Sequence, residues 1–547
     1  MEYYLTGEQA GIIDKYTQEV IGIPGIVLME KAAMAIVDHI KFMYINASSD
    51  NVLAVVESGN NGGDAVAAVR ILKTMGFSTF VYEINGIEKK SESYLKQVEI
   101  ARNLGVQFLN DTGIEPDFKD FKIILDGIFG VGLSRPVTGR HAEVIEAINK
   151  CEGPYKIAVD IPSGINATTG ETMGVSLKCN ATVTFDFTKY GMLFGDGRDR
   201  SGVISCREIG LFRTALPKDM KKALPEEDML VYEYDGRSLW ERVPRRVFEG
   251  NKGTFGKLLV VAGSREIYGA SYLASRAAYK AGAGMVKVVT DIVNRDVLCE
   301  KIPEALMLTY DSDADIEKFV TGAYAESIKW ADAVVIGPGL GKSEVAKRLL
   351  EELINGCTDK KIVIDADALN LISEDTTLYF DMFRNRIGKG HIAITPHMLE
   401  MARLLKGMGD DEISEMGIES KDKITPEFIK ENRLELATAF AAKYGVTVVL
   451  KDARTIVATP YEPFEVYINT DGNSGMAKAG SGDVLAGMIG GFMTANKLFH
   501  EVDFDTAVRV GVRLHAIAGD YAQLNKGINA MLADDIVEHI NEAFRCV

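Results

Sequence analysis

The chain has 547 residues, 47% of them hydrophobic, and its 78 acidic residues outnumber 61 basic ones to give a formal charge of −17. One hydrophobic core rarely grows beyond about 250–300 residues, so we expect at least two domains. The acidic balance argues against a sequence-independent nucleic-acid-binding protein. Because no apolar stretch approaches the ~20 residues of a membrane helix and no secretion signal is visible, we expect a cytoplasmic protein without membrane contact.

The first half alternates short apolar runs with helical patterns, which is typical of an α/β fold with a mostly parallel sheet. Apolar residues recur at helical spacing between Glu8 and His39, with a break near Gly22–Gly25. The expected strands are Asn51–Glu57, Ser78–Glu83, Ile123–Asp126, Lys156–Asp160 and Ala181–Phe185.

A proline-containing, charged segment, Leu216–Arg246, predicts a linker and the entry to a second domain. We place the boundary so that the domains are residues 1–224 and 225–547. The alternation then resumes, and the expected strands are Lys257–Ala262, Met285–Thr290, Ala333–Ile336, Lys361–Asp365, His391–Thr395, Thr447–Lys451 and Thr455–Ala458. The segment Lys406–Arg433 is rich in charge, so we expect a surface excursion with a solvated helix and no catalytic role.

The cysteines are scattered and form no Cys-x-x-Cys pair, so neither a zinc site nor a disulfide framework is indicated. We expect reduced, buried thiols. The six are Cys151, Cys179, Cys206, Cys299, Cys357 and Cys546.

The most informative run is residues 472–487, in which Gly475, Gly480 and Gly482 precede Asp483 and an apolar helical pattern follows. Glycines at this spacing let backbone N–H groups approach an anion, and the helix adds its positive end. A carboxylate there can accept a proton from a hydroxyl that attacks a phosphoryl group. A structural Gly-rich turn is the alternative, but the small, polar character of the whole run favours an anion site.

Three expected strands of the first half end in an oxygen-bearing residue beside glycines. One runs into Ser58–Asp64, a Gly-rich turn with two asparagines, and the others end at Asp126 and Asp160. An Asn-Gly turn alone is often only a turn. Because parallel strands present their carboxyl ends at one edge, the three together predict one shared crevice. Carboxylate and amide oxygens suit an alkali or alkaline-earth cation.

These motifs, Asn-Asn-Gly-Gly-Asp (60–64), Asp-x-x-Phe-Gly-x-Gly (126–132), Asp-Ile-Pro-Ser-Gly (160–164) and Thr-Val-Thr-Phe (182–185), resemble the NAD(P)H-hydrate epimerases. Such enzymes interconvert the R and S forms of C6-hydrated NAD(P)H on a Rossmann-like, three-layer αβα domain. The resemblance implies a potassium ion at Asn61, Asp126 and Ser163, with Asp160 as the acid/base. It implies that the hydrated nucleotide contacts Asn60, Asn61, Gly62, Gly63, Asp64, Gly130, Val131, Gly132, Leu133, Ser134, Arg135, Pro136 and Asp160. Glu57 replaces a glycine usual in that family.

In the second half, candidate site residues again follow expected strands: Gly337–Gly341, Asp365–Asn370 and Thr395–His397. The turn Lys451–Thr455 joins two strands and can present N–H donors and a lysine to a phosphate, or it can be a β-turn and nothing more. Small residues dominate Ala270–Ala283, so either a neighbouring helix or a ligand packs closely there.

This set resembles the ribokinase-like superfamily and, within it, the ADP-dependent NAD(P)H-hydrate dehydratases, which implies a ribokinase-like αβα domain. The order epimerase then dehydratase is that of bifunctional repair enzymes across nearly the whole chain. The resemblance implies nucleotide contacts at Lys451, Asp452, Ala453, Arg454, Thr455 and Gly482, and hydrated-substrate contacts at Ala281, Gly341, His397 and Asp483. Asn251 and Met398 depart from the usual residues.

The implied reaction is phosphorylation of the C6 hydroxyl of NADHX or NADPHX, the hydrated forms of NADH and NADPH, by ADP, with Asp483 as base and magnesium bridging the phosphates, followed by elimination. The resemblance also implies a homo-oligomer. Two alternatives stay open at this point. The second half can be a kinase that acts on a vitamin alcohol, or the first half can be a non-catalytic nucleotide-binding or scaffold domain.

Overall fold

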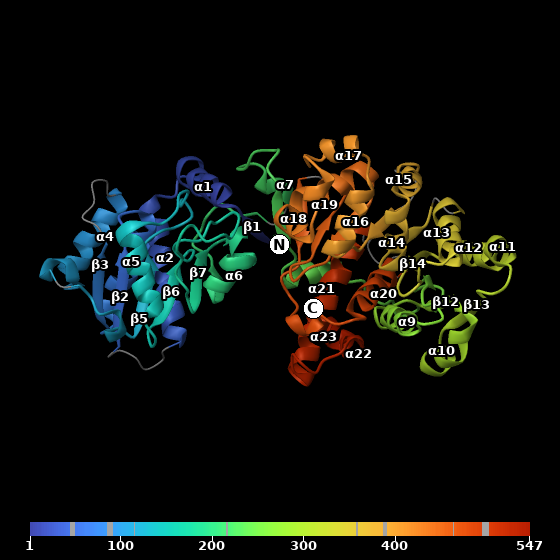
Figure 1. Ribbon diagram of the computed structural model, residues 1–547. Helices are drawn as coiled ribbons and strands as arrows, with labels where there is room; N and C mark the ends of the chain where they lie inside the picture. Colours follow the sequence, from blue (N-terminus) through green and yellow to red (C-terminus); the bar gives the residue numbers. More distant parts are fainter. Residues whose placement is uncertain are drawn as a thin grey trace. The chain divides into compact units, whose positions relative to one another are not determined.

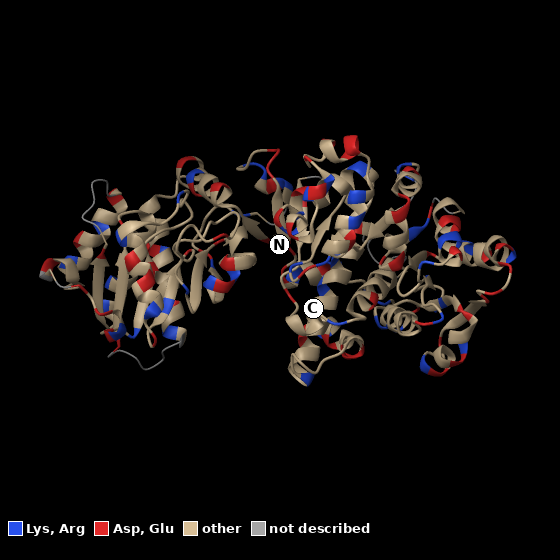
Figure 2. Cartoon of the chain, viewed as in Figure 1, with Lys and Arg blue, Asp and Glu red and all other residues tan. Residues whose placement is uncertain are grey.

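The computed structural model describes residues 1–43, 50–84, 91–113, 115–214, 217–356, 359–386, 391–462, 464–494 and 503–546. Contacts divide the chain into two compact units, Met1–Val231 and Tyr232–Val547 (Figure 1). The division falls within strand β10 (Leu230–Glu233), beyond the predicted boundary at residue 225. Acidic and basic side chains are interspersed over both units (Figure 2).

The described part of unit 1 contains a parallel sheet with the strand order β4-β3-β2-β5-β6-β7-β9. This is a doubly wound order, which reverses direction between β2 and β5. The strands of the unit are β1 (Glu2–Leu5), β2 (Asn51–Val56), β3 (Ser78–Glu83), β4 (Gln107–Phe108), β5 (Ile123–Gly127), β6 (Tyr155–Val159), β7 (Ala181–Phe185), β8 (Thr188–Lys189) and β9 (Val203–Arg207). Outside that sheet, β1 pairs with β8 in parallel.

Helices cover both faces of this sheet, which confirms the Rossmann-like three-layer fold. Val52, Ala54 and Val56 of β2 pack with one set of helices, and Leu53 and Val55 pack against α5 on the other face, because strand side chains alternate. The helices are α1 (Gly7–Tyr16), α2 (Gly25–Met43), α3 (Asn60–Thr74), α4 (Glu92–Asn103), α5 (Gly139–Lys150), α6 (Gly195–Ser201) and α7 (Pro217–Met220).

Unit 2 contains a mixed sheet with the order β13-β12-β11-β14-β15-β16-β17-β18-β19. The strands from β13 to β17 are parallel, and β18 and β19 continue the sheet as antiparallel strands. They are β11 (Lys257–Val261), β12 (Met285–Asp291), β13 (Leu306–Tyr310), β14 (Ala333–Ile336), β15 (Lys361–Ile364), β16 (His391–Ile394), β17 (Thr447–Leu450), β18 (Ile456–Ala458) and β19 (Glu465–Ile468).

Helices α9 (Gly269–Lys280) and α20 (Ser481–Thr494) lie side by side and pack on this sheet (Figure 1). A Cβ at Gly487 would lie 2.1 Å from the carbonyl oxygen of Ala274, so only glycine permits this close approach. The small residues of α9 therefore face a neighbouring helix. The other helices are α8 (Gly236–Arg242), α10 (Arg295–Lys301), α11 (Ile316–Phe319), α12 (Ala325–Trp330), α13 (Glu344–Gly356), α14 (Asp367–Glu374), α15 (Thr376–Arg384), α16 (Met398–Gly407), α17 (Asp410–Glu415), α18 (Pro426–Glu431), α19 (Arg433–Tyr444), α21 (Phe504–Lys526), α22 (Ala533–Glu538) and α23 (Ile540–Arg545).

Every predicted strand is present, with ends that differ by a residue or two. The prediction of a solvated surface excursion at Lys406–Arg433 holds for its charged residues, which are mostly exposed, but not for the whole segment. Its isoleucines, Ile413, Ile418, Ile424 and Ile429, are all buried, so this segment packs onto the rest of unit 2 through one face. Within the described residues, no helix is long and apolar enough to cross a membrane.

The prediction of buried thiols holds for one cysteine only. Cys179 is buried and Cys151 is half-buried, whereas Cys206, Cys299 and Cys546 are exposed. These five are free thiols, as expected, and Cys357 lies outside the described residues.

Candidate active sites

A cavity of about 1370 Å³ opens in unit 1 beside the turns that follow β2 and β5. Ligands in open parallel sheets bind at this reversal of strand order, and the volume suits a dinucleotide. Of the predicted substrate-binding residues, the cavity is lined by Asn60, Asn61, Asp64, Gly130, Val131, Gly132, Leu133, Ser134, Arg135 and Asp160. Gly62, Gly63 and Pro136 do not line it.

The two glycines set the position of helix α3, which begins at Asn60, within the segment predicted as a Gly-rich turn. A Cβ at Gly62 would lie 1.8 Å from the carbonyl oxygen of Glu57, and one at Gly63 would lie 2.5 Å from Met29 Cε. The first turn of α3 therefore lies directly on the strand end and on α2. As a result, Asn60, Asn61 and Asp64 line the cavity.

Asp160 follows β6 with a φ of 69°, in the left-handed region that residues other than glycine rarely adopt. Such a conformation costs about 1–3 kcal/mol and persists only where neighbours enforce it. Here the Thr184 hydroxyl donates to its carboxylate at 3.0 Å, and the Phe185 N–H donates at 3.3 Å. The carboxylate also forms an ion pair with Lys189, whose side chain is 4% exposed.

The predicted cation ligands lie together. The Asp126 carboxylate accepts from the Ser163 N–H at 2.8 Å and from its hydroxyl at 2.5 Å. Asn61 Nδ2 donates to the carbonyl oxygen of Phe129 at 3.1 Å, and the Ser163 hydroxyl accepts from the Phe129 N–H at 2.9 Å. Burial raises the pKa of Asp126 to about 6, although the bonds from Ser163 oppose this. The result is a buried set of carboxylate, hydroxyl, amide and carbonyl oxygens.

Two further carboxylates belong to this cavity. Asp14, on α1, was not predicted, and burial raises its pKa. Burial, and then the charges of Asp160 and Asp14, raise the pKa of Asp64 well above its usual value, while Lys189 opposes the rise. Asp14, Asp64 and Asp160 are far apart in the sequence, so the sequence did not indicate that they form a cluster.

The sequence also gave no signal for a pair on the same cavity wall, formed by Glu57 and His141. His141 Nε2 lies 2.5 Å from Glu57 Oε1, and its ring centroid lies 5.0 Å from that of Phe129. Glu57, which replaces the usual glycine, is thus paired with the imidazole of His141.

In unit 2, Asp483 lies in the first turn of α20, as predicted. Burial, and then the charge of Asp365, raise the pKa of Asp483 to about 7, while Lys451 opposes the rise. The Asp365 carboxylate is 1% exposed and accepts from Lys451 Nζ and from the Thr395 hydroxyl, each at 2.7 Å. A Cβ at Gly482 would lie 3.4 Å from Lys451 Nζ, so the lysine adjoins the glycine turn. The structure therefore brings Lys451, Gly482 and Asp483 together.

His397 is the N-cap of α16, and its Nδ1 accepts from the N–H groups of Leu399 and Glu400 at 3.1 and 3.2 Å. Its Nε2 lies 3.4 Å from Glu400 Oε1, and burial and Lys451 lower its pKa. Glu400 also lies 3.8 Å from Lys451 and was not predicted. His397 therefore belongs to the network around Lys451.

The other predicted residues of unit 2 divide into two groups. Gly341 donates its N–H to Asp367 at 2.8 Å, beside Ala366, which has a φ of 49°. Ala281 lies apart from Asp483: it is 2% exposed, and a Cβ at Gly491 would lie 2.9 Å from its side chain. Gly491 is two turns beyond Asp483 on α20, or about 12 Å along the helix.

The turn Lys451–Thr455 connects β17 and β18 as an antiparallel hairpin. Asp452 pairs with Arg433 at 3.4 Å, and Arg454 Nη1 donates to the carbonyl oxygen of Thr470 at 2.7 Å. These contacts hold Ala453 and Thr455 in a defined turn next to Lys451.

Helix α21 contacts the glycine-rich run, residues 472–487, through polar side chains. Asp520 accepts from the Gly472 N–H and from Asn473 Nδ2, each at 2.9 Å. One turn earlier His515, which is 7% exposed, faces the backbone of Ser481, and burial lowers its pKa to about 4. The run therefore contacts this helix at two places, near Gly472 and at Ser481, a feature that the sequence did not indicate.

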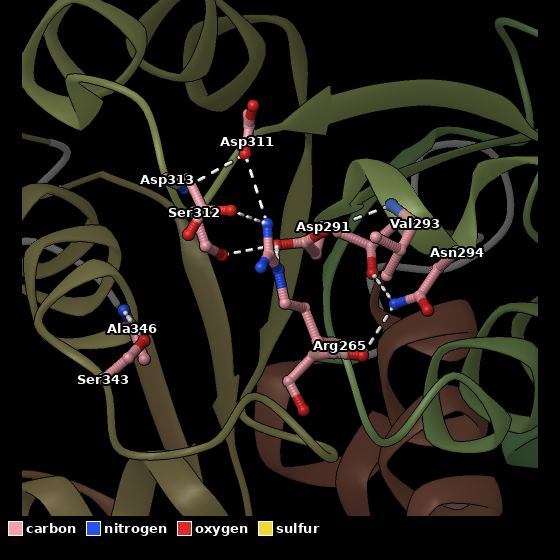
Figure 3. A network of polar contacts seen from close by, with 11 residues as sticks. Arg265, Asp291, Val293, Asn294, Asp311, Ser312, Asp313, Ser343 and Ala346 are labelled. Atoms are coloured by element: carbon pink, nitrogen blue, oxygen red, sulfur yellow. Dashed lines mark hydrogen bonds and ion pairs between the residues drawn. The ribbon is translucent and has the colours of Figure 1, made fainter.

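A polar network lies where β11, β12 and β13 end (Figure 3). Arg265 Nη2 donates to Asp313 at 2.6 Å, and its Nε lies 3.4 Å from Asp291, which is fully buried. The neighbouring residue Ser264 lies within 4 Å of the position of a Cβ at Gly341. The network thus fixes the loop after β11 beside the predicted substrate residue.

A Rossmann-like unit followed by a ribokinase-like unit, each with an aspartate beside a glycine-rich turn, defines a two-domain α/β enzyme. The NAD(P)H-hydrate dehydratase family matches residues 258–542, and the YjeF-related protein N-terminus family matches residues 25–191.

The chain is 31% identical to the bifunctional NAD(P)H-hydrate repair enzyme Nnr of Moorella thermoacetica, over 99% of this chain and 97% of that protein. It is 32% identical to the Nnr of Escherichia coli, over 96% of this chain and 90% of that protein. A ribokinase-like superfamily protein from Enterococcus faecalis has 27% identity and a TM-score of 0.46, over 58% of this chain and 95% of its own. The chain belongs to the family of bifunctional NAD(P)H-hydrate repair enzymes.

Proposed function

We propose that unit 1 epimerises the R and S forms of NADHX and NADPHX, and that unit 2 dehydrates the S form at the expense of ADP. The observation that carries this proposal is Asp483, a carboxylate with a pKa raised to about 7 at the start of α20, beside Lys451. A base is most effective when its pKa lies near the working pH.

In unit 2, the Asp483 carboxylate accepts the proton of the C6 hydroxyl while that oxygen attacks the β-phosphorus of ADP. The bond to the bridging oxygen breaks and AMP leaves. The lone pair of the ring nitrogen then expels phosphate from C6, and loss of a C5 proton restores NAD(P)H. Phosphate leaves readily, whereas hydroxide does not.

Charge on the transferring group is stabilised by the N–H groups of Gly480–Gly482 and by Lys451. The hairpin Lys451–Thr455 holds the adenine nucleotide, and Gly341 and His397 contact the hydrated ring. Ala281 is buried in the α9–α20 packing, so this proposal gives it no direct contact. Magnesium, bound with the nucleotide, supplies further positive charge at the phosphates.

In unit 1, Asp160 exchanges a proton with the oxygen at C6 of the substrate. The ion pair with Lys189 keeps the Asp160 carboxylate in place. The oxygens of Asn61, Asp126 and Ser163 fit a potassium ion, because they are hard donors around a buried carboxylate. The ion would add a fixed positive charge beside the cavity. We also propose a homo-oligomer, which light scattering of the purified chain would test.

The test incubates the full chain with hydrated NADH and either ADP or ATP. We expect the absorbance of NADH to recover, with AMP and phosphate released in equal amounts when ADP is present. A kinase that phosphorylates an alcohol would instead leave the phosphate on its product. No recovery of NADH with either nucleotide would refute the dehydratase assignment, and the two nucleotides together measure the preference for ADP.

A further inference from the structure

Epimerisation at C6 requires proton transfer on both faces of the ring, which a single acid/base residue cannot provide. If the hydroxyl leaves from one face of the ring and water arrives on the other, a proton must be donated on the first face and accepted on the second. Two proton-transfer groups on different walls of the cavity are then required.

The cavity of unit 1 provides carboxylates from three separate elements. Asp160 follows β6, Asp64 belongs to α3 and Asp14 belongs to α1, and all three line the cavity. Asp160 has a cationic partner, Lys189, in a close ion pair. Among the described residues, no lysine or arginine lies at ion-pair distance from Asp64. Asp64 therefore lacks the cationic partner that Asp160 has.

We propose that Asp64 is the second catalytic residue of the epimerase and acts as a carboxylic acid opposite the Asp160 carboxylate. This inference rests on the epimerase function proposed above. From the epimer whose hydroxyl lies on its side of the ring, Asp64 donates its proton to the C6 hydroxyl as the C–O bond breaks, and water leaves. The electron pair of the ring nitrogen forms the N1=C6 bond.

A second water then attacks C6 from the other face and gives a proton to Asp160, and the electron pair returns to nitrogen. In the reverse direction the two aspartates exchange roles. Each turnover therefore exchanges the C6 oxygen for one from solvent, and the proton moved between the aspartates is restored through water.

The charges around Asp64 support this assignment. Burial, Asp160 and Asp14 favour its protonated form, and Lys189 opposes them. Glu57 and His141 also line the cavity, but they are hydrogen-bonded to each other. The pair Asp64 and Asp160 thus has the unlike environments that separate an acid from a base.

The test compares Asp64→Asn, Asp160→Asn and the wild type by the rate of R-to-S conversion above the uncatalysed rate. We expect each variant to lose about 10²–10⁴-fold, the range for general acid–base groups. Substrate affinity, measured by calorimetry, should change little, because asparagine keeps the size of the side chain. Asp111→Asn, at an exposed ion pair with Arg102, is the control.

Two further measurements distinguish chemistry from folding. In H₂¹⁸O the wild type should introduce one labelled oxygen per conversion. Asp14→Asn, which removes a negative charge near Asp64, should move the alkaline limb of the pH profile to lower pH, because Asp64 then loses its proton sooner.

The outcomes separate the two proposals. A wild type without interconversion would refute the epimerase function itself. An active wild type whose Asp64→Asn variant keeps the full rate, or whose product retains its original oxygen, would overturn the role of Asp64 alone. If Asp64→Asn fails to fold, the Asp14→Asn profile decides: an unmoved alkaline limb would overturn the proposal.

Discussion

Asp160 in unit 1 follows strand β6, Asp483 in unit 2 adjoins a glycine-rich turn, and their surroundings differ. Asp160 is constrained by a positive φ and by an ion pair with Lys189. Asp483 has Asp365 near it, and Lys451, the nearest cation, is already bonded to that second carboxylate. The first aspartate is thus held in position by direct contacts, whereas burial near Asp365 raises the pKa of the second and makes it a stronger base.

The difference shows that the residue type alone does not decide a catalytic role. A close lysine stabilises the charged form, and burial near like charge destabilises it. In the mechanism proposed above both aspartates accept a proton, Asp160 from a position fixed by its contacts and Asp483 with a pKa near neutrality.

The largest expected effect comes from Asp483→Asn. Loss of the base should lower the dehydration rate by about 10²–10⁴-fold, and AMP release should fall with it. R-to-S conversion in the same preparation is the internal control and should not change. Undiminished AMP release would show that Asp483 is not the base.

Lys189→Met tests whether the ion pair with Lys189 holds Asp160 in unit 1. Breaking a buried ion pair leaves the Asp160 charge uncompensated and typically costs about 3–5 kcal/mol. We expect unit 1 to unfold at lower denaturant, as followed by hydrogen exchange of β6 and β7, with epimerisation lost. Arg102→Met, at an exposed pair, is the matched control and should cost less than about 1 kcal/mol.

Gly487→Ala tests whether the position of α20 matters to Asp483. The added methyl group would lie 2.1 Å from a backbone oxygen of α9, so the helices must separate. We expect a loss of about 1–3 kcal/mol in stability and a slower dehydration step. The control is Gly322→Ala, where nothing lies within 4 Å of the new Cβ. Equal melting temperatures for the two variants would contradict the close packing.

The smallest expected effect is the pH dependence of dehydration. Because Asp483 must be ionised to accept a proton and its pKa is about 7, kcat/KM should rise about 10-fold between pH 6 and 8. Lys451 lowers that pKa, so Lys451→Met should move the rise to higher pH. An unshifted profile would remove Lys451 from the electrostatics of the site.

Burial of Asp483 also predicts a change in stability with the opposite sign. Its pKa is raised from 3.8 to about 7 in the folded chain, so folding binds the proton more tightly. The free energy of unfolding therefore falls as pH rises from about 4 to 7, and Asp483→Asn should melt at a higher temperature than the wild type at pH 8. Calorimetry of both proteins checks this, and equal melting temperatures would argue against the raised pKa.

Much of both sites was predictable because the residues follow strands, and parallel strands end at one edge. Asp126, Ser163 and Asn61 meet for this reason. Lys451 also follows a parallel strand, β17, whereas Gly482 and Asp483 were predicted from the glycine-rich run at the start of α20. Asp14 and His141 were not predictable, since they reach the cavity from helices whose sequences carry no glycine-rich or strand-end signal. Glu400 is similar: it looks like an ordinary helix residue until α16 is placed beside β17.

The fold was misread where periodicity is interrupted. Between Lys406 and Arg433 the buried isoleucines are five or six residues apart, because short helices alternate with turns. Neither a helical nor a strand period appears at that spacing. Strands β13 and β19 were not predicted, although Leu306–Tyr310 and Glu465–Ile468 both contain apolar residues.

Helix α21 contacts the glycine-rich run at two places, Gly472 through Asp520 and Ser481 through His515. A rigid support of this kind leaves the loop little freedom to lose when a diphosphate arrives. Association should therefore carry only a small ordering entropy, and the bare loop should already protect its amide hydrogens from exchange. Replacing Asp520 or His515 by alanine would remove one of these contacts, and a nucleotide would then have to order the loop when it binds.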